Sequence, residues 1–298
     1  MMRAELTFIT PLFSRGAYED LPEIRPASIR GQLHHWFRLL GGSAADERGV
    51  FGSVHKDFGG HDLVPAASRL VVRVAGLAAP DAAAQWLPTL PHKPGGQNPR
   101  NAPNAPRGAL PAGTRFTLVV LERLGGLSPE LRAFAERTVH AWLLAGALGL
   151  RATRGGGAFH WSEAPTDLRS FWHRLSGLFQ DAPVSFDVLD RVFPNAEDAR
   201  KVITETIAHP ALADLAYPLG AVRQGNSDPA PGRKTSPLRL TVRRFADGNR
   251  ILALWDERGT VTGNTRAHLR DAIKRLANGT SQSRPTEIGR LLAASKLP

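Results

Sequence analysis

The chain has 298 residues, of which 42% are hydrophobic and 22% charged, and this balance excludes a wholly disordered protein. Its 38 Lys and Arg against 27 Asp and Glu leave a net charge of +11, which makes polyanions expected partners. A basic protein without nucleic acid is the alternative. No cysteine is present, so disulfides, thiolate metal sites and cysteine nucleophiles are excluded.

The N-terminal residues, MMRAELTFITPLFSRG, lack the apolar core and the cleavage site of a signal peptide. No segment approaches the roughly 20 apolar residues that cross a bilayer. We therefore expect a cytoplasmic protein with no membrane partner.

Residues 1–165 predict a strand, helix, strand, strand, helix, strand order. In the chain these are a strand at 3–10, a helix at 28–40, strands at 69–76 and 114–122, a helix at 128–148 and a strand at 158–162. Ser28 is predicted to cap the first helix, and Ser128 with Pro129 begins the second. This order is that of the ferredoxin-like fold.

A proline-rich stretch interrupts this unit at 88–111. It holds seven prolines among Asn, Gly and scattered basic residues. Proline removes backbone donors, and Asn and Gly favour turns, so the stretch predicts a mobile insertion with no core element.

Residues 166–298 predict a second, less regular domain. Helices are predicted at 168–180, 197–208, 264–278 and 286–294, with a loop at 220–237 before a hairpin of 238–245 and 250–255. The fold class is therefore α+β, with a ferredoxin-like first domain and a less regular α+β second domain.

The first helix has a basic row beside its apolar stripe. Arg30, His34 and Arg38 recur at i, i+4 and i+8, so they lie on one side of the helix. Guanidinium groups in such a row can bind phosphates, and His can add a hydrogen bond or a stacking contact. A solvated charged face is the other interpretation.

A glycine-rich loop, residues 146–157, follows the second predicted helix. Gly155, Gly156 and Gly157 come directly after Arg151 and Arg154. Glycines let backbone amides approach a phosphate, and the two arginines add charge. The loop has neither Walker A nor dinucleotide-binding spacing, and a flexible turn is the alternative.

Four segments in this order resemble the RAMP proteins of CRISPR systems. They are ITPLFSRGA at 9–17, RPASIRGQLHHWFRLLGG at 25–42, ERGVFGS at 47–53 and the glycine-rich loop. The RPxSIRGxLxxWxR form, with SPLRL at 236–240, resembles the first-numbered RAMP subunit of the type III-B Cmr complex.

The resemblance implies a non-catalytic subunit that contacts guide RNA, target RNA or both, near the end of a filament of RAMP subunits. It also implies two tandem ferredoxin-like domains, the second less regular than the first, and no cofactor. The RNA-binding residues expected from it and from the basic row are Arg25, Ser28, Arg30, Gly31, His34, Arg38, Arg151, Arg154, Gly155, Gly156 and Gly157.

Two other functions stay open. RAMP proteins include endoribonucleases with a general-base histidine, so His34 or His35 could serve metal-independent cleavage, although no second proton carrier is placed by the sequence. A protein scaffold without RNA affinity is the third possibility. His55, Asp57, His61 and Asp62 could hold a divalent ion, but their spacing is typical of an ordinary polar loop and we predict no metal site.

Overall fold

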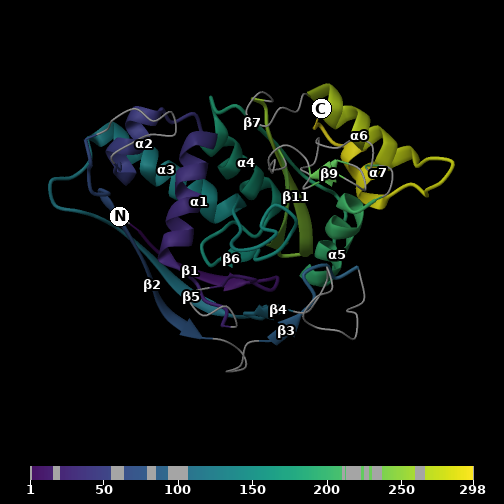
Figure 1. Cartoon of the computed structure of the whole chain (residues 1–298), viewed down its shortest axis with the longest axis horizontal. Coiled ribbons are helices and arrows are strands. Elements are labelled where there is room, and N and C mark those ends of the chain that lie inside the picture. The colour runs from purple at the N-terminus through teal and green to yellow at the C-terminus, as the bar shows by residue number, and fades with distance from the viewer. Residues whose placement is uncertain are drawn as a thin grey trace.

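The structure is a computed structural model. It describes residues 2–15, 21–54, 64–78, 85–92, 107–209, 212, 223–224, 228–229, 237–258 and 266–297. Figure 1 shows two halves, each with its own antiparallel sheet: the first runs from purple to teal and the second from green to yellow.

The first half contains the six predicted elements in the predicted order. They are β1 (Met2–Phe8), α1 (Pro26–Leu39), β2 (Leu70–Ala78), β5 (Arg115–Glu122), α3 (Pro129–Ala145) and β6 (Phe159–Trp161). The sheet has the order β2-β5-β1-β6, and all neighbouring strands are antiparallel. This connectivity is ferredoxin-like, as the sequence predicts.

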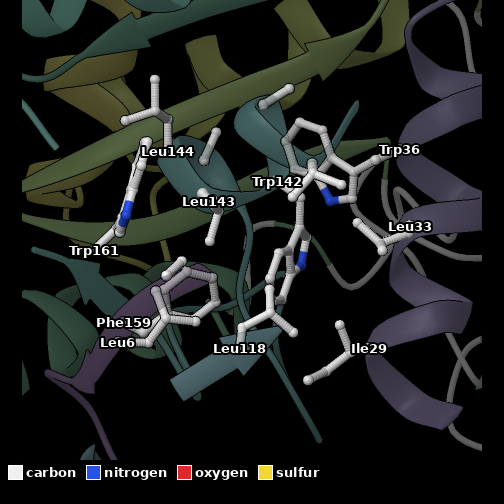
Figure 2. Close-up of a cluster of buried hydrophobic side chains, with 14 of the residues drawn as sticks. Leu6, Ile29, Leu33, Trp36, Leu118, Trp142, Leu143, Leu144, Phe159 and Trp161 are labelled. Atoms are coloured by element: carbon white, nitrogen blue, oxygen red, sulfur yellow. The ribbon is translucent and has the colours of Figure 1, made fainter. Parts of the chain in front are cut away.

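An apolar core lies between this sheet and its two helices. Ile29, Leu33 and Trp36 of α1 are fully buried, at the spacing that places them on one side of a helix. They face Trp142 of α3 and Leu118 of β5, as Figure 2 shows. Burial of this stripe decides which side of α1 faces outward.

The start of α1 differs from the prediction. The helix begins at Pro26, two residues before Ser28, and Arg25 occupies the N-cap position without a side-chain cap. Proline suits the first helical turn because its missing N–H has no partner to lose there. A short helix that the sequence analysis missed, α2 (Ala44–Phe51), follows; Ser43 caps it by accepting from the Asp46 N–H at 3.0 Å.

The second half is also a mixture of helices and strands. Its elements are α4 (Leu168–Phe179), β7 (Val184–Val188), α5 (Ala196–Ile207), β8 (Arg223–Gln224), β9 (Asp228–Pro229), β10 (Leu238–Phe245), β11 (Gly248–Asp256), α6 (Arg266–Asn278) and α7 (Glu287–Ala294). A three-stranded antiparallel sheet has the order β10-β11-β7. The hairpin turn is two residues, Ala246 and Asp247, and β7 is a strand that the sequence analysis missed. The α+β class is confirmed.

The ends of the proline-rich stretch are packed. β4 (Arg107–Ala109) pairs with β3 (Gln85–Leu87), and Thr89 is buried where its carbonyl accepts from Arg200 of α5 at 2.9 Å. The prediction that residues 88–111 contribute no packed element is therefore wrong at both ends. Residues 93–106 lie outside the described residues, and their predicted mobility stays a prediction.

The two halves share apolar core. Phe171, Leu175 and Phe179 of α4 belong to the same buried cluster as α1 and α3, and the Phe179 ring lies parallel to that of Trp36 with centroids 6.2 Å apart. Side chains from both sides of the predicted domain boundary, between residues 165 and 166, therefore pack together. The boundary itself stays a prediction.

Candidate nucleic-acid interface

The basic row on α1 contacts α2. His34 Nδ1 lies 2.6 Å from Glu47 Oε1, and Arg38 Nη1 lies 3.6 Å from the same oxygen. Arg30 donates to the carbonyl of Phe51, whose ring centroid lies 4.2 Å from that of His34. The row therefore exists as predicted, but α2 orders it and offsets part of its charge.

The other α1 residues predicted for the site lie at its exposed beginning. Arg25 pairs with Glu23 at 3.3 Å, and both side chains are about half exposed, so this ion pair contributes little to stability. Ser28 and Gly31 are exposed. A Cβ atom added at Gly31 would meet nothing within 4 Å.

His35 points to a different neighbourhood from His34. Burial, followed by the positive charges of Arg239, Arg38 and Arg258, lowers the pKa of His35 to about 3. The ring is therefore neutral at physiological pH, and its Nε2 atom is buried without a hydrogen-bond partner in the described part of the chain. A base with so low a pKa accepts a proton poorly near neutrality.

The glycine-rich loop is tied into the protein through its backbone. The N–H of Gly155 donates to the Leu240 carbonyl at 2.8 Å, that of Gly156 to Arg151 at 3.1 Å and that of Gly157 to Pro11 at 2.9 Å. All three glycines are buried. In this conformation their amides are not offered to a phosphate, in contrast to the cradle that the sequence suggests.

The arginines of the loop remain candidates for phosphate contact. Arg151 and Arg154 are half-buried, and Arg151 has a φ of 61°, which is uncommon for a residue other than glycine. Strand β10 is linked both to the glycine-rich loop and to α1. Its Leu240 carbonyl accepts from the Gly155 N–H of the loop, and the charge of its Arg239 helps burial to lower the pKa of His35 on α1.

The site residues predicted from the sequence did not include two arginines of β10, the half-buried Arg239 and the buried Arg243. Arg243 donates to the Phe159 carbonyl at 2.8 Å and to the Gly146 carbonyl, and so joins the two ends of the glycine-rich loop. Burial lowers the pKa of Arg243 to about 9 and that of Arg239 to about 10. The SPLRL segment could have drawn attention to this strand, but nothing in the sequence indicates that these two side chains point into the protein.

The residues considered for a metal, His55, Asp57, His61 and Asp62, lie outside the described residues. Within the described ranges, no group of three or more His, Asp or Glu side chains could hold a metal ion. No helix in the described part of the chain is both long and apolar enough to cross a membrane.

The RAMP superfamily model matches residues 5–160, which is more than half of the chain. The chain belongs to the RAMP superfamily. Its matched region begins within β1 and ends within β6, and so includes both the α1 row and the glycine-rich loop.

Two solved structures share the fold. The apo form of Cmr1 from Pyrococcus furiosus is 14% identical, with a TM-score of 0.51, covering 86% of this chain and 88% of that one. A chain of the type III-B Cmr-beta complex bound to cognate target RNA and AMPPnP is 11% identical, with a TM-score of 0.55, covering 86% and 94%. No curated protein matches the sequence.

Proposed function

We propose that this RAMP protein is a non-catalytic RNA-binding subunit of a type III CRISPR ribonucleoprotein complex. It would contact guide RNA, target RNA or both, beside other RAMP subunits. Membership of the superfamily, the net charge of +11 and the fold shared with a chain from a target-RNA-bound complex support this function.

The observation that carries the proposal is Gly31. This glycine lies inside α1, where glycine costs about 1 kcal/mol relative to alanine. It is exposed, and no described atom lies close enough to forbid a side chain. Packing inside the protein therefore gives no reason for glycine, whereas close approach of an RNA backbone does.

Gly31 also has suitable neighbours. His34 and Arg38 follow it at i+3 and i+7, which places them on the same side of the helix. The Arg38 side chain is 49% exposed, so its guanidinium can reach a phosphate beside the glycine.

We expect Gly31→Ala to raise stability and lower RNA affinity together. Alanine should add about 1 kcal/mol to the free energy of unfolding. Its methyl group should weaken binding of single-stranded RNA about tenfold, corresponding to a steric cost of ~1.4 kcal/mol. Urea unfolding and fluorescence anisotropy with labelled RNA measure the two effects.

Gly177→Ala is the matched control, since Gly177 is an exposed helical glycine of α4 that also has nothing within 4 Å of its Cβ position. It should be stabilising without changing RNA affinity. Equal RNA affinity in wild type and both variants would remove Gly31 from the proposed interface.

RNA binding by the chain should weaken linearly in log salt, with a slope of about −0.7 per phosphate contacted. An affinity unchanged between low and moderate salt would favour the protein scaffold instead. The same samples test the nuclease alternative. We expect no RNA cleavage with or without divalent ions, and cleavage that disappears in His34→Ala or His35→Ala would establish the enzyme.

A further inference from the structure

One face of β10 carries polar residues toward the first half of the protein. Arg239 and Thr241 pair across the sheet with Leu254 and Leu252, so all four side chains lie on the same face. The two leucines belong to the core shared with α1 and α3. Arg239 is thus directed toward the junction of the two halves.

Arginine side chains gather at this junction around the C-terminal part of α1. Arg258 donates to the Arg38 carbonyl at 2.8 Å, and Arg239, Arg38 and Arg258 all act on the buried ring of His35. The Nε2 atom of that ring is buried and has no hydrogen-bond partner among the described residues.

Two carboxylates in the described part of the chain interact with these three arginines. Asp256 accepts two hydrogen bonds from Arg258, at 3.0 and 2.9 Å, and Glu47 lies 3.6 Å from Arg38 while also bound to His34. The Arg239 side chain makes no hydrogen bond to the described residues, although the charge of Asp256 acts on its guanidinium. Gathering like charges in a partly buried place costs free energy unless an anion joins them.

The position of Arg239 on β10 links this group of arginines to the glycine-rich loop. Its neighbour Leu240 holds the glycine-rich loop, because the Leu240 N–H donates to the Thr153 carbonyl at 3.1 Å and its own carbonyl accepts from Gly155. Arg239 is half-buried, and it directly precedes the residue that holds the loop, while its charge acts on His35 of α1.

We propose that Arg239 and Arg38 together bind a backbone phosphate of single-stranded RNA at the junction of α1 and β10. This phosphate connects the RNA path on α1 to the glycine-rich loop, and the site therefore needs both halves of the protein. The inference rests on the proposed function and adds a binding residue beyond it.

Arg239→Gln tests the site in the full chain. It should weaken binding of single-stranded RNA about tenfold, as expected for a lost charge-assisted hydrogen bond. It should also reduce the steepness of the salt dependence by about 0.7, the share of one phosphate. Its melting temperature should stay the same or rise, because the substitution removes one of several neighbouring, partly buried positive charges.

Arg244→Gln is the matched control. It changes the same charge on the same strand, but Arg244 is exposed and alternation along β10 places it on the opposite face. Its affinity and salt dependence should stay within about twofold of wild type, on the scale expected for an exposed charge away from a site.

The His35 ring reports the anion directly. Burial and the positive charges of three arginines lower the pKa of His35. A bound phosphate should raise this pKa, because its negative charge offsets the arginine charges that Asp256 only partly offsets. An NMR titration of the ring, assigned with His35→Gln, should show this with a short single-stranded RNA. Inorganic phosphate at equal phosphate concentration should have a smaller effect.

Three results would overturn the inference. Wild-type RNA affinity and salt slope in Arg239→Gln, with a lowered melting temperature, would make Arg239 a structural link and leave the proposed function intact. A His35 response to inorganic phosphate but not to RNA would identify a small-anion site. Absence of any RNA binding by the wild-type chain would overturn the proposed function itself, and this inference with it.

Discussion

Trp36→Ala is expected to lower the free energy of unfolding by about 4 kcal/mol. Trp36 is fully buried in α1, and its ring lies against Phe179 of α4. Removing a buried indole loses its transfer free energy and leaves a cavity that close-packed neighbours fill poorly. The loss is a large part of the total stability of an ordinary domain.

Both halves should be affected by this substitution, because Trp36 and Phe179 lie on opposite sides of the predicted domain boundary. Urea unfolding followed by far-UV circular dichroism should show one transition, and hydrogen exchange should accelerate in α3 and in β11 alike. Trp86→Ala is the control, since Trp86 in β3 is 59% exposed and should cost under about 0.5 kcal/mol. A second transition that stays at its wild-type position would mean that the halves unfold independently.

Gly157→Ala should lower the free energy of unfolding by about 3 kcal/mol. Gly157 has a φ of +57°, which costs other residues roughly 1–2 kcal/mol. In addition, a Cβ atom there would lie 2.0 Å from the Leu148 carbonyl oxygen, which is backbone and can move only by disturbing the bond that Leu148 N–H makes to Gly157. Strain of this kind adds about 1–3 kcal/mol.

Gly125→Ala separates the two causes. Gly125 has a φ of +85°, but the nearest atom to its Cβ position is the end of the flexible Arg69 side chain at 3.1 Å. It should therefore show only the cost of the left-handed backbone, about 1 kcal/mol. Equal losses in both variants would contradict the tight contact at Gly157. Intact stability with weakened RNA binding in Gly157→Ala would return the loop backbone to the RNA interface.

Strong local patterns were sufficient to predict the first half. The apolar residues of α1 and α3 recur at helical spacing, and the alternation in β1, β5 and the β10–β11 hairpin marks strands. α2 and β7 were missed because they are short. In α2 only Val50 and Phe51 are buried, so the segment has no apolar stripe to detect, and its place is decided by contact with α1 and α3.

The candidate site also has features that local spacing predicted and features that depend on contacts between remote segments. Residue types and spacing placed Arg30, His34 and Arg38 on one side of a helix, and they lie there. That Glu47 reaches back to two of them could not be predicted, since α2 was not recognised. The amides of the glycine-rich loop looked available in the sequence, but carbonyls of Pro11 and Leu240, remote along the chain, accept from two of them.

β10 shows most clearly where local information ends. By itself the sequence LRLTVRRF determined a strand, its hairpin partner and the alternation of Arg239, Thr241 and Arg243 with apolar residues. Such alternation normally indicates a polar face in water. Only the tertiary structure decided that this face meets the first half, where Arg243 is buried against the Gly146 and Phe159 carbonyls and Arg239 lies near His35. The physical reason is that alternation assigns side chains to two faces, whereas the environment of each face depends on packing between segments far apart in the chain.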